Sequence, residues 1–356
     1  MADPASTVLP KRIDTGVPME ILLPSLAFLG AAICAGLMGY AIQRGATCTV
    51  AAMDELVRRR SVNRLISMVE ASLWVVGGLL IARSLHLLGT MPGGYAVTYV
   101  TILGGALLGL GAYVNQACVF GAIARLGSGE WAYVVTPLGF YTGCVTYPYV
   151  FSLPAQQKLP YDSPVLQAPL WVGFVFAAFM LWRLGRPLFA PSAAPDAPAA
   201  TMLQRIGHGL AGRVWSPHAA TSVIGVTFLV MFVLVGAWAY TDVLAELARG
   251  MAGSLIARCL LVLALLAGAM LGGYTAGRWR STPISVAQLS KCLAGGVLMG
   301  WGSLLIPGGN DGLILVGMPL LWPYAWTAFL TMCVSIATAL IVERAMIGDP
   351  IEQAVH

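Results

Sequence analysis

The stretch GGALLGLG, residues 104–111, returns later in the chain as GGVLMGWG, residues 295–302. The two copies are 191 residues apart, and the same offset carries Cys118 onto Gly309. Both copies lie inside long apolar runs, and glycine at this density is typical of helices that pack closely within a bilayer. The repeat predicts a membrane protein assembled from related units.

The composition supports this class for the whole chain. Of 356 residues, 58% are hydrophobic and 10% are charged, whereas soluble domains carry about 25% charged residues. The mean hydropathy of +0.80 excludes a water-soluble enzyme. Since helices satisfy their own backbone groups within lipid, we predict an all-α polytopic membrane protein surrounded by a lipid bilayer. The net charge of +5 comes without a basic tract that carries interleaved aromatic residues, so no nucleic-acid partner is expected.

Apolar runs of about 20 residues are long enough to cross a bilayer. One of the runs tolerates a few charges near its ends, and the others are uncharged. We therefore predict about nine transmembrane helices, over 21–43, 65–88, 87–124, 131–157, 163–182, 219–241, 259–277, 292–310 and 312–342.

The repeat and the polar segments suggest how the chain is divided. A stretch rich in proline and alanine separates two apolar halves, as expected of an exposed linker. The predicted parts are a polar N-terminal tail, a first transmembrane half, the linker, a second transmembrane half and a C-terminal tail, at 1–19, 20–187, 188–217, 218–346 and 347–356.

A polar interruption follows the glycine-rich part of each copy, at 115–118 and at 307–312. A third, shorter copy near the N-terminus has its interruption at 43–48, so that Cys48 closes it as Cys118 closes the first. After each interruption comes an apolar stretch too short to span. Broken helices at corresponding positions of a repeat are typical of transporter binding sites. We therefore predict re-entrant half-helices.

The start of a half-helix exposes unpaired N–H groups and the positive end of the helix dipole. The interruptions thus favour a pathway for a small anion. The alternative for the glycines themselves, Gly104, Gly105, Gly295 and Gly296, is that they only allow close helix packing.

Seven cysteines are present, without a CxxC pair, and only four histidines accompany them. No metal site or cofactor is predicted from this set. Cys48 and Cys118 stand apart because both precede a half-helix, where the thiol is aimed at a ligand. The others are interpreted as small buried apolar residues: Cys34, Cys144, Cys259, Cys292 and Cys333.

These segments resemble the YeeE/YedE family of thiosulfate transporters. The resemblance rests on 36–39 running into 43–48, on the block 104–129 and on the block 295–317. It extends over most of the chain, from about 23 to 340. It implies an importer of thiosulfate in the inner membrane, with an hourglass-like pathway in which loops from both faces meet at a constriction. Cysteine thiols at the loop tips pass the ion along by hydrogen bonds in that family, and a small TusA-like sulfur-carrier protein receives the sulfur in the cytoplasm.

The first two family cysteines fall on Cys48 and Cys118, and the third falls on Gly309. The chain departs from the family pattern there, and Asn310 or bare backbone N–H groups would stand in for the thiol. Another sulfur oxyanion or a selenium compound therefore stays open as the substrate.

Three other residues of the interruptions, Asn115, Gln116 and Arg44, are predicted to line the pathway. Arg44 is interpreted as a cation at the rim, and the alternative is an arginine that reaches the membrane interface. A carboxylate repels an anion, so Asp311 is interpreted as a helix cap or the partner of an arginine.

The alternative from another class is a membrane sulfurtransferase that carries a persulfide on Cys48 or Cys118. Nucleophilic cysteines need a neighbouring base or cation. All four histidines lie outside the interruptions, so we expect a transporter and not an enzyme. The basic cluster 58–60 with Arg64 is expected to face the cytoplasm.

Overall fold

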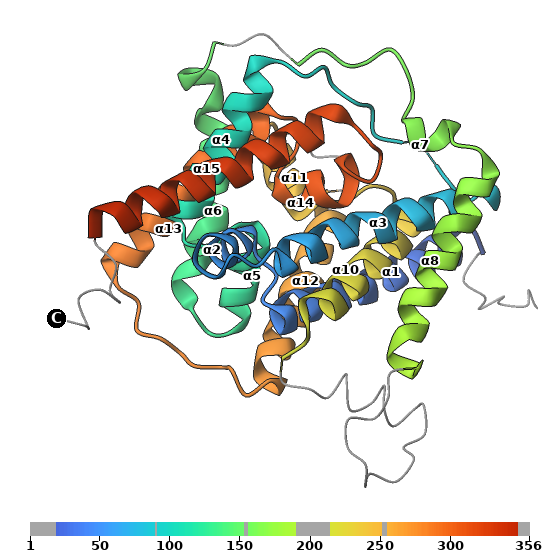
Figure 1. Cartoon of the computed structure of the whole chain (residues 1–356), viewed down its shortest axis with the longest axis horizontal. Coiled ribbons are helices and arrows are strands. Elements are labelled where there is room, and N and C mark those ends of the chain that lie inside the picture. The colour runs from blue at the N-terminus through green and yellow to red at the C-terminus, as the bar shows by residue number, and fades with distance from the viewer. Residues whose placement is uncertain (1–18, 90, 153–155, 190–213, 251–254, 348–356) are drawn as a thin grey trace, which may run out of the picture.

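The computed structural model describes residues 19–89, 91–152, 156–189, 214–250 and 255–347 (Figure 1). Within these residues the chain is helical, and one isolated bridge between Tyr95 and Lys158 is the only β-type pairing. Most of the predicted tails, 1–19 and 347–356, and of the predicted linker, 188–217, lies outside the described residues. The all-α polytopic class is confirmed.

The first half of the chain alternates long helices with short ones. The polar interruptions predicted at 43–48 and 115–118 separate a long helix from a short one in each case. Its helices are α1 Met19–Gly45, α2 Thr49–Arg59, α3 Asn63–Ser84, α4 Tyr99–Val114, α5 Val119–Gly127, the 3-10 turn η1 Trp131–Val134 and α6 Val135–Val150.

The second half repeats this order. Among the described elements, α7 Pro164–Gln167 and α8 Leu170–Phe189, which lie between the halves, have no counterpart, and neither does η1. The rest follow element for element: α10 Pro217–Val235, α11 Tyr240–Ala248, α12 Leu255–Thr275, α13 Val286–Leu305, α14 Asn310–Gly312 with the π-helical turn η2 Leu313–Gly317, and α15 Pro323–Ile347. The offset of 191 residues holds at the starts of the short helices, since α2 corresponds to α11 and α5 to α14.

Helix packing has the same two-fold relation. Helix α1 packs on α12 as α10 packs on α3, and α13 packs on α6 as α4 packs on α15. The pairs α1–α10 and α4–α13 join the two halves. In the second of these, Gly104 faces Gly302 and Gly111 faces Gly295, so the two helices run in opposite directions. The repeat is therefore inverted.

The repeated glycines lie where helix backbones touch. A Cβ on Gly105 would lie 2.6 Å from the carbonyl oxygen of Ala328, and one on Gly295 would lie 2.6 Å from that of Gly111. Real Cβ atoms do not approach so closely, so a side chain at these positions would push the helices apart. Close helix packing therefore explains these glycines. It does not explain why the helices are broken into half-helices.

Within the described ranges, six helical segments are long and apolar enough to cross a membrane, and a seventh is counted if α13 and α14–η2, bent by 49°, form one span. This supports a multi-pass membrane protein, but the predicted count of nine is not confirmed. The uncharged run 87–124 contains a non-helical connection before α4, and the run 312–342 is divided between η2 and α15. Hydropathy counts apolar residues and does not register where the backbone leaves the helix.

Candidate functional site

Four short helices begin near the middle of the molecule, where Figure 1 shows α2, α5, α11 and α14 among the long helices. Each starts after an N-cap residue with extended backbone: Cys48, Cys118, Ala239 and Gly309. Helix α5 contacts both α2 and α14, and α14 contacts α11. The four N-termini therefore converge, and their N–H groups and dipoles make this centre favourable for negative charge.

The break before α11 was not predicted from the sequence. Its residues 236–239 are glycine, alanine, tryptophan and alanine, so no polar residue marks it. The repeat offset is the signal that finds it, because it carries Cys48 onto Ala239.

The two predicted cysteines meet across the first pair of half-helices. The backbone N–H of Thr49, the first residue of α2, donates to Sγ of Cys118 at 3.2 Å. The N–H of Cys118 in turn donates to Sγ of Cys48 at 3.4 Å. Each thiol thus accepts a hydrogen bond from the other half-helix. Both are free cysteines, and Cys118 is fully buried whereas Cys48 is 9% exposed.

Asn310 connects this thiol pair to the second pair of half-helices. The Thr49 hydroxyl donates to Oδ1 of Asn310 at 3.4 Å. The Asn310 side chain is fully buried, and its Nδ2 has no hydrogen-bond partner among the described residues. An unpaired buried donor is costly. It therefore points to an acceptor that the protein itself does not supply.

The position of the third family cysteine is filled by a neighbouring side chain. A Cβ on Gly309 would lie 2.6 Å from Cβ of Thr241 in α11. Thr241 is held in place, since its N–H donates to Asp311 Oδ2 at 3.1 Å and its hydroxyl donates to Oδ1 of the same carboxylate. Asp311 is therefore a cap, as predicted, but it caps the start of α11.

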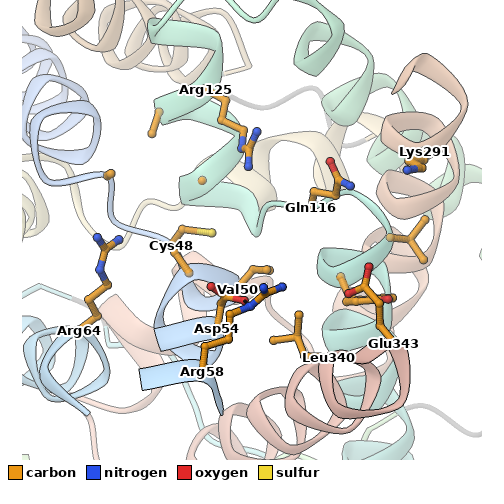
Figure 2. Close-up of a pocket in the computed structure, with 16 residues that line it drawn as sticks. Cys48, Val50, Asp54, Arg58, Arg64, Gln116, Arg125, Lys291, Leu340 and Glu343 are labelled. Atoms are coloured by element: carbon orange, nitrogen blue, oxygen red, sulfur yellow. Dashed lines mark hydrogen bonds and ion pairs between the residues drawn. The ribbon is translucent and has the colours of Figure 1, made fainter. Parts of the chain in front are cut away.

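A cavity of about 680 Å³ opens onto Cys48. We call it the vestibule. Figure 2 shows the Cys48 sulfur directed into the space between Arg125, Gln116 and Glu343. The lining side chains sum to a net positive charge, with four cations and two carboxylates: Arg58, Arg64, Arg125 and Lys291, with Asp54 and Glu343. Glu55 and Glu130, which are not part of the lining, pair with Arg64 and Arg125 and offset part of this charge. Such a cleft concentrates anions.

A second cavity of about 290 Å³ lies at the other end of the same helices. We call it the opposite cavity. Its lining includes Tyr95, which precedes α4, and Pro307, which follows α13. The vestibule instead contains Val114, the last residue of α4, and Lys291, near the start of α13. The converging half-helices thus lie between two cavities that open at opposite ends of α4 and α13.

The other predicted pathway residues are placed differently. Gln116 is exposed in the vestibule, on a turn with a φ of 59°. Asn115 is fully buried and braces the break, because its Nδ2 donates to the Ala117 carbonyl at 2.7 Å and its Oδ1 accepts from Thr136 at 2.9 Å. It therefore positions the half-helix and is satisfied without a ligand.

Arg44 is 2% exposed and is not part of the vestibule lining. Its Nη2 donates to the hydroxyl of Tyr40 at 2.7 Å and to Thr275 at 2.9 Å. The structure thus places Arg44 behind the break, where it ties α1 to α12. Arg125, which sequence reasoning did not select, lines the vestibule in its place and pairs with Glu130 at 3.0 Å.

In the described part of the chain, no group of three or more metal-ligating side chains is close enough to hold a metal ion. His218 is engaged elsewhere, since its Nε2 lies 2.9 Å from Oδ1 of Asn63 and its Nδ1 contacts Glu70. Two of the four histidines, His208 and His356, lie outside the described residues.

The vestibule predicts charge-selective labelling of Cys48. A small anionic thiol reagent should modify it about tenfold faster than a cationic reagent of equal size, because a cleft lined by positive charge raises the local anion concentration. Lys291→Gln should reduce this ratio, and Cys48→Ala should abolish the labelling. Rates measured by mass spectrometry of the Cys48 peptide test this. Faster reaction with the cation would contradict the assignment of the vestibule.

The site lies within a segment that matches a known family. The family described as sulphur transport matches residues 44–338, which include all four half-helices and the lining of both cavities apart from Leu340 and Glu343. No curated protein matches the chain. The chain belongs to the YeeE/YedE sulphur transport family.

Proposed function

We propose that this protein imports thiosulfate across the inner membrane. The observation that carries the proposal is the pair of thiols, Cys48 and Cys118, that face each other at two half-helix N-termini behind a cationic vestibule. The family supports transport of a sulfur compound. The thiols, the unpaired amide of Asn310 and the N–H groups favour a small sulfur-containing anion as this compound.

Thiosulfate has a soft terminal sulfur and hard oxygens. A thiol donates a weak hydrogen bond to either, and amide N–H groups favour the oxygens. An ion that must leave again needs several weak sites rather than one strong site. The half-helix centre meets this requirement because it offers thiols and amides, and Arg125 lies on the wall of the vestibule at its entrance. Two cavities on opposite sides of this centre support an hourglass-like pathway.

The missing third thiol bears on the choice of anion. Gly309 leaves the second pair of half-helices without sulfur, and the free Nδ2 of Asn310 is the donor next to it. An amide favours oxygen over sulfur as acceptor, so the oxyanion end of the substrate would face Asn310 while the terminal sulfur faces the thiols. Another sulfur oxyanion or a selenium compound with the same ends would fit the same donors.

The basic residues suggest the orientation. Arg58 and Arg64 line the vestibule, and loops rich in arginine remain on the cytoplasmic side. The vestibule is then the exit, where a TusA-like sulfur-carrier protein would collect the sulfur.

Uptake of labelled thiosulfate by the purified protein in liposomes tests this function. We expect saturable uptake that unlabelled thiosulfate suppresses and that sulfate, which lacks the soft sulfur, suppresses less. Empty liposomes are the control. Equal suppression by sulfate would contradict a role for the thiols in selection. If selenite or sulfite were taken up and thiosulfate were not, that anion would be the substrate in place of thiosulfate.

A dianion that enters a cell moves against the membrane potential. The cost is about 2.3 kcal/mol for each elementary charge and each 100 mV, so thiosulfate meets twice this barrier. The proposed function therefore requires a source of free energy.

A further inference from the structure

The second pair of half-helices carries carboxylates where the first pair carries thiols. Asp311 is the second residue of α14 and Asp242 is the third residue of α11. Asp311 is 2% exposed. The Asp242 carboxylate oxygens lie 3.8 and 3.9 Å from the point where a Cβ on Gly312 would be, so this carboxylate faces the start of α14. Two acidic groups thus flank the pathway of an anion.

Neither carboxylate has a counter-ion in contact. Among the described residues, the ion pairs within 4 Å involve other acids, and Arg258 near Asp242 is already paired with Glu246. Burial favours the neutral form of a carboxyl group, and a second carboxylate nearby favours it further. The other titratable or charged groups that face the pair are Tyr240, Glu246 and Arg249 on or next to α11, Arg258 on α12, Cys144 on α6, Tyr324 on α15, and Lys158 in the opposite cavity.

Water in the opposite cavity can reach the pair. Asp242 lines the opposite cavity together with Gly308 and Gly312, and Asp311 lies buried behind it. Protons can reach Asp242 from water in this cavity. They then have a neighbouring acceptor in Asp311, in the manner of the carboxylate relays of membrane pumps.

Asp311 also competes with the substrate for the same donors. Its carboxylate accepts from the N–H and hydroxyl of Thr241, and the N–H of Gly312 acts on it as well. An anion at the half-helix centre needs N–H groups of this kind. The Nδ2 of the neighbouring Asn310 has no acceptor among the described residues. While Asp311 is charged it repels the anion and occupies these donors. A neutral Asp311 releases them.

We propose that Asp311 and Asp242 bind protons as the anion passes, so that the protein is a proton–anion symporter. The proposal rests on the proposed function, which supplies the anion. Each carboxylate takes one proton from the opposite cavity when the anion binds, and the two protons leave on the vestibule side after the anion, so that two protons cross with the two negative charges of thiosulfate. Anion and proton strengthen each other's binding by linkage, since each reduces the repulsion that the other meets.

Uptake driven by a pH gradient tests the coupling. With liposomes one pH unit more acidic outside, accumulation of labelled thiosulfate should rise up to about a hundredfold over liposomes without a gradient, since each coupled proton contributes a factor of ten. In Asp311→Asn and in Asp242→Asn the ratio of accumulation with and without the gradient should fall to about the tenfold of a single proton, since one carboxylate remains in each variant. The exposed Asp162→Asn is the matched control and should behave as the wild type.

A second measurement needs no substrate and keeps the proposal testable if a variant transports nothing. Infrared spectra of the reconstituted wild type should show a protonated carboxyl band that is reduced in Asp311→Asn and in Asp242→Asn but not in Asp162→Asn. Identical spectra would overturn the proposal. Thiosulfate uptake that ignores the pH gradient would also overturn it while leaving the proposed function intact. A carboxyl band that behaves as expected, without any thiosulfate uptake, would overturn the proposed function and leave the proton site standing.

Discussion

Replacing Cys118 by alanine should lower the initial rate of thiosulfate uptake about tenfold to a hundredfold. The thiol is fully buried, and it accepts the N–H of Thr49 at the start of α2. Its removal takes away one contact of the ion and leaves a buried N–H without a partner, which costs about 1–3 kcal/mol, where 1.4 kcal/mol is a factor of ten. Cys48→Ala should act in the same direction, since its sulfur accepts from Cys118.

Two controls separate thiol chemistry from packing. Cys333→Ala removes an equally small buried side chain from α15, away from the half-helices, and should leave uptake within about twofold of wild type. Cys118→Ser keeps a hydrogen-bonding group but loses the soft sulfur, and should fall between wild type and Cys118→Ala. Wild-type uptake by both Cys48→Ala and Cys118→Ala would exclude the thiols from the pathway.

Restoring the third family cysteine should destabilise the protein. In Gly309→Cys the new Cβ would lie 2.6 Å from Cβ of Thr241. Thr241 cannot yield easily, because its N–H is bonded to Asp311. Overpacking of this kind costs typically about 1–3 kcal/mol. We therefore expect a lower midpoint of thermal unfolding in detergent and reduced uptake.

The close contact with Thr241 also predicts a second substitution that should restore the stability of Gly309→Cys. Adding Thr241→Gly to Gly309→Cys removes the opposing Cβ and should recover most of the lost thermal stability. Gly312→Ala is the matched control, since its Cβ would lie 3.8 Å from the nearest atom, an ordinary contact. If Gly309→Cys alone were as stable as wild type and faster in uptake, the site would have room for a third thiol, and the close approach of Thr241 would be wrong.

The sequence predicted the parts of the site that polar residues mark. Glutamine, arginine and asparagine inside apolar runs indicated the breaks before α2, α5 and α14, and the repeat aligned Cys48 with Cys118. The break before α11 was missed because its residues are apolar, although the repeat offset that carries Cys48 onto Ala239 points to it.

Side-chain roles were harder to predict than positions. Asn115 and Arg44 occupy the breaks as expected, yet each hydrogen-bonds within the protein scaffold. By sequence Arg125 follows directly on the uncharged run 87–124, and it lines the vestibule because the short helix α5 begins at the centre of the molecule. The direction of a side chain depends on the packing of helices distant in sequence, which hydropathy does not encode.

The glycine contacts between the long helices restrict how this transporter can work. A Cβ on Gly111 would meet the carbonyl oxygen of Gly295 at 2.7 Å, and one on Gly296 would meet that of Thr136 at 2.5 Å. Backbones in such close contact resist sliding, because α4 would first have to separate from α13. We therefore expect the long helices to form a rigid scaffold and the motion that admits an ion to involve the half-helices and their side chains.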